Sequence, residues 1–202
     1  ALSTLPSLMP NPDFEEGING WVARTGFRLE PVSDITHSGH GAVKITGTGK
    51  AQNEYMVTRY ACGAPWEIMG LQPGQKYRLS AWIRVDEITP GTPAVNLRCA
   101  MRDRGQTREA FATNTYDHSK PGTWQRLTCE FTAPAYTTSA YVAINMNTRE
   151  TVNIVMYADD LTLTSATAPE QSAVVYNAAT AEQASLAGGA KLTIAKTGPK
   201  WQ

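Results

Sequence analysis

The sequence predicts an all-β domain, an antiparallel β-sandwich of two sheets, and three observations lead to this fold class. Apolar and polar residues alternate at every second position in several segments, which is typical of half-buried strands. Turn signals that contain Gly or Pro separate these segments. No long segment before residue 170 carries apolar residues at the helical spacing, so no helical crossover is available to connect parallel strands.

Five segments show the alternation clearly, and each of them predicts one strand. In residues 77–85, every second residue from Tyr77 to Val85 is apolar or small, whereas Arg78, Trp82 and Arg84 face the other side. The same pattern predicts four further strands, at residues 95–102, 124–131, 141–147 and 155–163. Short turns separate them, at residues 72–74, 89–91, 121–122 and 133–134.

Length and composition allow one domain with a tail. The chain has 202 residues, of which 42% are hydrophobic, which is enough for a sandwich core. We assign residues 1–164 to the sandwich and residues 165–202 to a linker and a C-terminal extension. Within the extension, helix formers fill residues 178–187, and residues 191–195 predict a short strand. An alternative is that the extension begins a following domain.

The charge balance and the cysteine count exclude several classes of protein. The 18 basic and 18 acidic residues cancel, whereas non-specific nucleic-acid binding needs clustered Lys and Arg. No apolar stretch approaches the length of about 20 residues that crosses a bilayer. We therefore expect neither nucleic acid nor a membrane as a partner. Three Cys are too few for a disulfide framework; Cys99 and Cys129 lie at core positions, with a bond between them as an alternative.

Five segments carry a family resemblance, and they occur in the family's order. They are residues 11–21 (NPDFEEGINGW), 37–45 (HSGHGAVKI), 71–82 (LQPGQKYRLSAW), 122–125 (GTWQ) and 157–163 (YADDLTL). Together they resemble the carbohydrate-binding modules of families four, sixteen and twenty-two, the CBM_4_9 type, over roughly residues 9–164. The resemblance implies a jelly-roll sandwich with one concave, sugar-binding sheet and a structural calcium ion.

Acidic residues lie near both ends of the predicted domain. Asp13 and Glu15 are at its start, and Asp159 is in its last strand. Because the terminal strands of a sandwich often lie close together, these carboxylates are candidates to converge around a hard cation. Calcium prefers oxygen ligands and would suit such a site. The resemblance assigns the metal to Asp13, Gly41 and Asp159, and Glu15 is a further candidate. The alternative is a solvated acidic edge without a metal.

The residues opposite the predicted core offer planar amides, guanidinium groups and aromatic rings, which are the groups that bind sugars. We expect eight of them to share one face: Trp82, Arg84, Asn96, Arg98, Arg102, Tyr141, Asn145 and Asn147. The resemblance places Arg98 and Asn145 in the sugar cleft. The Arg residues favour an acidic polysaccharide, although a neutral β-glucan or xylan stays equally open. The alternatives are an ordinary polar face and a Trp82 covered by a loop or by the tail.

No arrangement in the sequence indicates catalysis. His37, His40 and His118 lie in loop-like segments, and no carboxylate pair is placed to hydrolyse a glycosidic bond. We therefore predict a non-catalytic module that binds a polysaccharide and targets an attached glycoside hydrolase or polysaccharide lyase domain. We expect a secreted or cell-surface location, extracellular or periplasmic. The alternatives are a structural or interaction domain of a larger polysaccharide-active enzyme and a small polysaccharide-degrading enzyme.

Overall fold

The structure is a computed structural model, which describes residues 7–9, 11–50, 54–58, 71–145, 151–166, 184–185 and 191–192. The chain divides into two compact units, residues 5–167 and residues 1–4 with 168–202. The larger unit contains the sandwich. The described part of the chain holds no helix with the length and apolar character of a membrane span.

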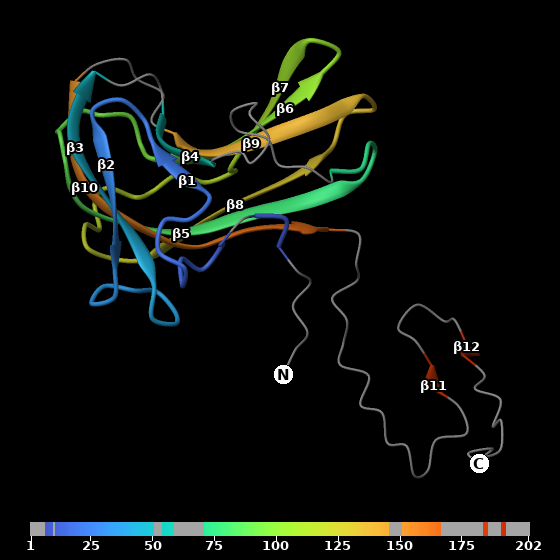
Figure 1. The fold of residues 1–202 in the computed structure, drawn as a ribbon, viewed down its shortest axis with the longest axis horizontal. Coiled ribbons are helices and arrows are strands. Elements are labelled where there is room, and N and C mark those ends of the chain that lie inside the picture. Colours follow the sequence, from blue (N-terminus) through green and yellow to red (C-terminus); the bar gives the residue numbers. More distant parts are fainter. Residues whose placement is uncertain are drawn as a thin grey trace. The chain divides into compact units, whose positions relative to one another are not determined.

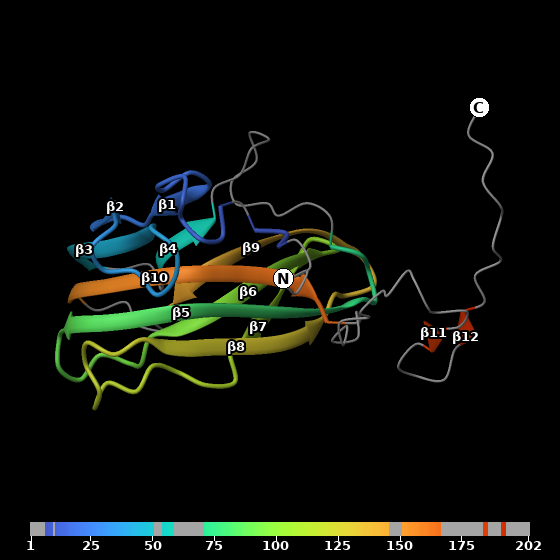
Figure 2. The same ribbon diagram turned by 90° about the horizontal axis from the view of Figure 1, so that it is seen from below.

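Two antiparallel five-stranded sheets pack face to face in the larger unit (Figures 1 and 2). The first, called the front sheet, has the order β1 (Trp21–Ala23), β4 (Glu54–Thr58), β9 (Thr137–Asn145), β6 (Asn96–Asp103) and β7 (Gln106–Phe111). The second, called the back sheet, has the order β2 (Phe27–Val32), β3 (Ala42–Lys50), β10 (Thr151–Ser165), β5 (Lys76–Ile88) and β8 (Gln125–Thr132). The predicted all-β sandwich, of the jelly-roll type, is confirmed.

The core forms between the sheets from the apolar residues of each alternating strand. In the back sheet, Ala81 lies opposite Leu127, and both are fully buried. In the front sheet, Leu97 lies opposite Ile144, and both are also fully buried. These pairs show why segments with apolar residues at every second position form strands here: the apolar side of each strand is buried in the core.

Cys99 and Cys129 lie in this core as free thiols, one in each sheet. Burial raises the pKa of both thiols, that of Cys129 to about 11. Each therefore stays protonated at neutral pH and packs as a small apolar residue, as expected from its position.

Some elements differ from the sequence expectations. Strand β7 and strands β1 to β4 were not among the predicted segments; β7 is an edge strand whose residues are mostly exposed, so it lacks the apolar alternation. In the tail, Ala184–Ser185 forms strand β11 and pairs with β12 (Lys191–Leu192). The helix expected at residues 178–187 is therefore wrong at its two described residues, where strand pairing outweighs local helix propensity.

The two ends of the sandwich sequence are joined by backbone hydrogen bonds. The N–H of Leu8 donates to the carbonyl of Leu163 at 2.8 Å, and the N–H of Leu161 donates to the carbonyl of Pro12 at 2.7 Å. These contacts hold the N-terminal segment along the last strand, so the acidic residues near each end come to one region.

Candidate functional site

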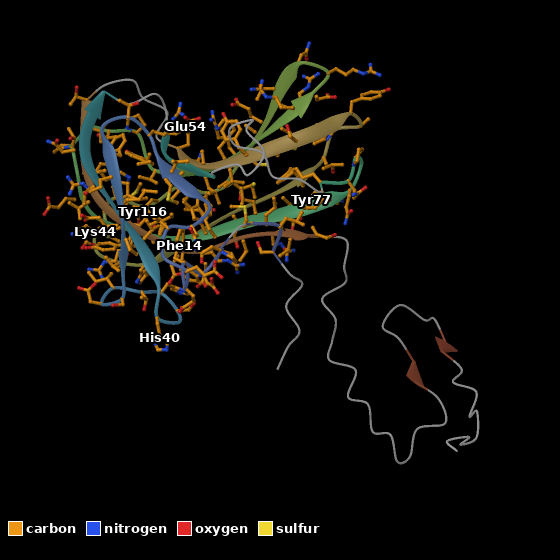
Figure 3. The ribbon with its side chains drawn as sticks, viewed as in Figure 1. Phe14, His40, Lys44, Glu54, Tyr77 and Tyr116 are labelled. Atoms are coloured by element: carbon orange, nitrogen blue, oxygen red, sulfur yellow. The ribbon has the colours of Figure 1, made fainter. Side chains whose placement is uncertain are left out.

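The outward face of the front sheet carries most of the polar residues expected at a binding face. Residues that lie directly opposite in an antiparallel pair share a face. The register therefore places on one face seven side chains from four strands: Glu54, Asn96, Arg98, Glu109, Phe111, Tyr141 and Asn145. Figure 3 shows Glu54 on this side of the sandwich.

Arg98 connects these strands through its guanidinium group. Its Nη1 donates to Glu109 Oε1 at 2.9 Å on β7. Its Nη2 donates to Glu54 Oε1 on β4 and to the Tyr141 hydroxyl on β9, the latter at 2.8 Å. Only 8% of Arg98 is exposed. The guanidinium carbon also lies 5.4 Å from the centre of the Tyr141 ring, within the range of a cation–π contact.

Glu54 also contacts several of these side chains, and together Arg24, Glu54, Arg98, Glu109 and Tyr141 form what we call the Arg98 cluster. Glu54 Oε2 lies 3.1 Å from Arg24 Nε, and its Oε1 accepts a hydrogen bond from the Tyr141 hydroxyl at 3.3 Å. Burial, the largest cause, raises the pKa of Tyr141, so this phenol stays a donor at neutral pH. Two carboxylates thus face two guanidinium groups, and their charges cancel within the cluster.

The cluster is not fully satisfied. The Nε–H of Arg98 is buried, and no group within the described ranges accepts its hydrogen bond. A buried donor without an acceptor costs about 1–3 kcal/mol. Buried polar groups without a partner are few in folded proteins, so this donor marks the cluster as a candidate site.

The other predicted residues of the front sheet lie at different depths. Asn145 is fully buried, and Asn96 is 7% exposed, with its side-chain oxygen accepting the N–H of Leu97 at 2.7 Å. Arg102 is exposed and donates to the Thr107 hydroxyl at 3.3 Å. The two amides are therefore shielded from solvent, whereas Arg102 is accessible. Asn147 lies outside the described residues.

Trp82 and Arg84 do not belong to this face, and the expectation of one shared face is wrong for them. Both lie on β5 in the back sheet. The Trp82 ring stacks on His37 with centroids 3.8 Å apart, so a loop residue covers it. Arg84 pairs with Asp86 at 2.7 Å. Alternation tells which side of a strand faces the core, but it does not tell to which sheet the strand belongs.

The sequence analysis missed four residues in and beside the Arg98 cluster: Arg24, Glu54, Glu109 and Phe111. Phe111 is 39% exposed and lies directly opposite Arg98. The pairing of β4 with β9 is irregular between Glu54 and Met56, which breaks the period-two pattern around Glu54. Glu109 and Phe111 are two positions apart on β7, so their side chains face the same side. This spacing could have grouped them in the sequence, but only if β7 had been recognised as a strand.

A second cluster lies where the N-terminal segment, the turn at residues 37–41 and strand β10 meet. Asp159 is fully buried; its carboxylate accepts the backbone N–H groups of His37 at 2.8 Å, Ser38 at 3.0 Å and Asp160 at 2.7 Å. Glu15 Oε1 accepts the N–H groups of His40 at 2.6 Å and Gly41 at 3.1 Å. Burial raises the pKa of Asp159, and the three backbone donors oppose that shift.

These residues offer oxygen donors, which suit a hard cation. Within the described ranges, however, no three acidic, His or Cys side chains converge as metal ligands would. Asp13 is exposed, and the partners named above for the Asp159 carboxylate are backbone N–H groups. Each carboxylate oxygen has two lone pairs, so Asp159 Oδ1 and the second oxygen of Glu15 keep acceptor capacity. A cation here would therefore need backbone carbonyls in addition to the two carboxylates.

Two shallow hollows lie away from the Arg98 cluster. One of about 540 Å³ is lined by residues of β2, β3, β5 and β10, including Arg28 and Glu87. The other, of about 530 Å³, lies beside Thr89, Tyr116 and His118. Burial lowers the pKa of His118, and its Nε2 accepts the N–H of Val95 at 3.4 Å, which is a structural role.

Comparisons with known proteins agree with the resemblance seen in the sequence. A family model described as "Carbohydrate binding domain" (CBM_4_9) matches residues 7–151. No curated protein sequence matches the chain. Among solved structures, the chain is similar to the CBM22-2 xylan-binding domain of Xyn10C from Paenibacillus barcinonensis. The identity is 24%, the TM-score is 0.55, and the match covers 76% of this chain and 96% of that one.

Two structures from Clostridium thermocellum are also similar. The C-terminal family 22 module of Xyn10B, described for the role of conserved cleft residues in ligand binding, has 18% identity and a TM-score of 0.59 over 77% of this chain and 92% of that one. The CBM22-1 and GH10 modules of endo-1,4-β-D-xylanase 10B, complexed with xylohexaose, have 17% identity and a TM-score of 0.59, over 78% of this chain and 28% of that one. At these identities the likeness is one of fold.

Substituting Gly41→Ala should destabilise the domain by about 1–3 kcal/mol, because the added methyl group overpacks the contact between this turn and the N-terminal segment. A Cβ at this position would lie 2.4 Å from the Phe14 carbonyl oxygen and 2.9 Å from the Glu15 nitrogen, both backbone atoms. Urea unfolding followed by Trp fluorescence measures the change.

The neighbouring substitution His40→Ala is the control, since His40 is exposed and points away from the domain (Figure 3). It should change the free energy of unfolding by less than about 0.5 kcal/mol. Equal stability of the Gly41→Ala variant and the wild type would contradict the close packing of this turn on the N-terminal segment.

Proposed function

Because the chain belongs to the CBM_4_9 family of carbohydrate-binding domains, we propose that it binds a polysaccharide on the outward face of the front sheet and does not cleave it. The sequence similarity shows the family, and the residues on this face supply the argument for where the sugar lies.

The observation that carries the proposal is the exposed ring of Phe111 beside the fixed polar groups around Arg98. Sugar rings present C–H patches that pack on aromatic faces, together with hydroxyl groups that both donate and accept hydrogen bonds. Phe111 and Tyr141 supply rings, and Glu109, which is 39% exposed at its side chain, supplies an acceptor. Because Arg98 and Glu54 are held by ion pairs, these groups need little ordering when a chain binds.

The ligand proposed for this face is a polysaccharide of the xylan or β-glucan kind. Similar structures are described as xylan-binding or as complexed with xylohexaose, which supports this class. We also propose that the domain is attached to a glycoside hydrolase or polysaccharide lyase domain, which it targets to the polysaccharide, and that the protein is secreted or at the cell surface. The Clostridium thermocellum neighbour, in which such a module is joined to a GH10 module, supports the attachment.

Substituting Phe111→Ala should weaken binding to soluble xylan at least about tenfold, because the stacking ring is lost while the ion pairs remain. Affinity gel electrophoresis with xylan in the gel measures retardation, and calorimetry with xylohexaose measures Kd.

The matched control is Leu8→Ala, which removes another exposed apolar side chain, one whose backbone is bonded to the back-sheet strand β10. This variant should bind as the wild type does. Loss of retardation in both variants, or in neither, would count against binding on the front sheet.

We further propose a structural calcium ion at the second cluster, held by the carboxylates of Asp159 and Glu15 together with backbone carbonyl oxygens of Asp13 and of the turn at Gly41. The oxygen-rich donor set and the buried charge of Asp159 support it. Burial raises the pKa of Asp159. Without a counter-charge, its contribution to stability is therefore lost as pH rises through its folded-state pKa. A bound cation would offset that loss.

Calcium at one hundred times its Kd should stabilise the folded domain by about 2.7 kcal/mol, and a chelator should reverse the effect. Thermal unfolding with calcium and then with EDTA measures it as a change in Tm. The variant Glu15→Gln should show a smaller calcium effect, whereas Glu16→Gln, which removes the neighbouring exposed carboxylate, should keep the full effect. A Tm that does not respond to calcium in the wild type would overturn the proposed metal.

A further inference from the structure

The turn that joins β6 to β7 holds an arginine in a backbone conformation that arginine rarely adopts. This turn projects from the front sheet (Figure 1). Its two central residues, Arg104 and Gly105, have φ angles of 49° and 76°. Positive φ at both positions is typical of a type I′ hairpin turn, which favours Asn, Asp or Gly at the first of them. Arg104 therefore adopts a conformation that its Cβ disfavours, and strained residues of this kind are candidates for function.

An exposed aromatic ring holds the side chain of Arg104. The guanidinium carbon lies 3.2 Å from the centre of the Tyr136 ring, and Tyr136 is 52% exposed. The five N–H groups of a guanidinium lie in its plane, so a contact through its face leaves them directed to the sides. Among the residues that the structure describes, none accepts a hydrogen bond from Arg104. The ring therefore orders a guanidinium whose donors are available to a ligand.

The two carboxylates of the β6–β7 hairpin are engaged with other arginines. Residues 96–111 contain four arginines and two acidic residues. Asp103 Oδ2 lies 3.6 Å from Arg108 Nε, and the Asp103 side chain is 14% exposed. Glu109 accepts a hydrogen bond from Arg98 at 2.9 Å. The positive charge of the hairpin therefore exceeds its negative charge, and the excess lies on the other two arginines.

Arg102, two positions before Arg104, is the second of these arginines and forms no ion pair among the described residues. It is exposed, and its Nη1 donates to the Thr107 hydroxyl at 3.3 Å. Glu109 lies diagonally next to Arg102 across the strand pair, so the charge of Arg102 is partly compensated. Arg104 lies two positions farther along the hairpin and is the less compensated of the two. Arg104 is therefore the principal candidate for contact with an anion, and Arg102 supports it.

From this arrangement we infer that Arg104, stacked on Tyr136 and supported by Arg102, binds the carboxylate of a uronic-acid unit. A carboxylate accepts two parallel N–H bonds from a guanidinium edge, and these charge-assisted bonds are stronger than those of a neutral hydroxyl. The site is distinct from the Arg98 cluster, since Arg102 lies four residues from Arg98 on β6, roughly 13 Å at strand spacing. The inference rests on the proposed function because the ligand is a polysaccharide: the uronic acid is a side group of a xylan chain or a unit of an acidic chain.

The test is calorimetric titration of the protein with three polymers, at low and at physiological salt. They are glucuronoxylan, the same glucuronoxylan after reduction of its carboxylates to alcohols, and polygalacturonate. The reduced polymer differs from its parent in the carboxylate, so the ratio of the two affinities measures the contribution of that group. We expect the wild type to bind the parent about three- to tenfold more tightly, with a larger ratio at low salt. Polygalacturonate shows whether uronic acids of an acidic chain are also bound.

The decisive variant is Arg104→Asn, because Asn suits the positive φ of a type I′ turn and removes the guanidinium. This variant should lose the preference for the parent polymer while its Tm stays unchanged or rises. Arg104→Lys keeps the charge without the planar fork, so it should lose most of the preference. The matched control is Arg126→Gln on β8 of the back sheet, which removes an exposed guanidinium that donates to Ser80 Oγ at 3.4 Å. This control should keep the preference.

The outcomes separate the inference from the proposed function. A wild type that binds both forms of glucuronoxylan equally tightly overturns the inference and leaves the proposed function intact. The same conclusion follows if the preference survives in Arg104→Asn, is fully kept in Arg104→Lys or is lost in Arg126→Gln. If the wild type binds glucuronoxylan or polygalacturonate through Arg104 but does not bind the reduced polymer, binding of a neutral chain on the front sheet fails and the uronic-acid site stands. If the wild type binds none of the three polymers, both are overturned.

Discussion

The ion pairs of Arg98 are the interaction on which the outward face of the front sheet depends. One guanidinium on β6 contacts Glu109 on β7, Tyr141 on β9 and Glu54 on β4, so it fixes the spacing of four strands. Removing one partner of a buried pair costs about 3–5 kcal/mol, because the other charge is left without compensation. The ion pairs therefore hold the polar groups in place, so these groups need little reordering when a ligand binds.

On the outward face of the back sheet, a tryptophan ring is covered by a histidine, and two arginines pair with carboxylates. His37 covers Trp82, and the Trp124 ring lies at 70° to the same imidazole with the two ring centroids 5.8 Å apart. Arg84 pairs with Asp86, and Arg78 pairs with Glu130. Aromatic and charged side chains occur on both sheets, but an accessible ring beside a fixed donor and acceptor network is found at Phe111. The two outward faces therefore contain similar types of residue, but they differ in which side chains a ligand can reach.

Strands that bury one side could be predicted from the sequence, whereas the assignment of strands to sheets could not. β5, β6, β8, β9 and β10 each show alternation, because burial selects apolar residues at every second position. Consecutive strands β5 and β6 belong to different sheets, so Trp82 and Arg98 share parity without sharing a face. Phe111 and Glu109 lie on an exposed edge strand, and Glu54 lies at an irregularity of pairing, so neither segment shows the apolar alternation that reveals a strand.

The central claim, that a glycan binds on the front sheet, is tested most directly by NMR titration of the backbone and Trp indole N–H signals with xylohexaose. The account predicts chemical-shift changes along β6, β7 and β9, with the largest at Glu109 and Phe111, and unchanged indole signals of Trp82 and Trp124. Changes centred on those two indoles and on β5, with the signals of β7 unmoved, would place the ligand on the back sheet and contradict the account.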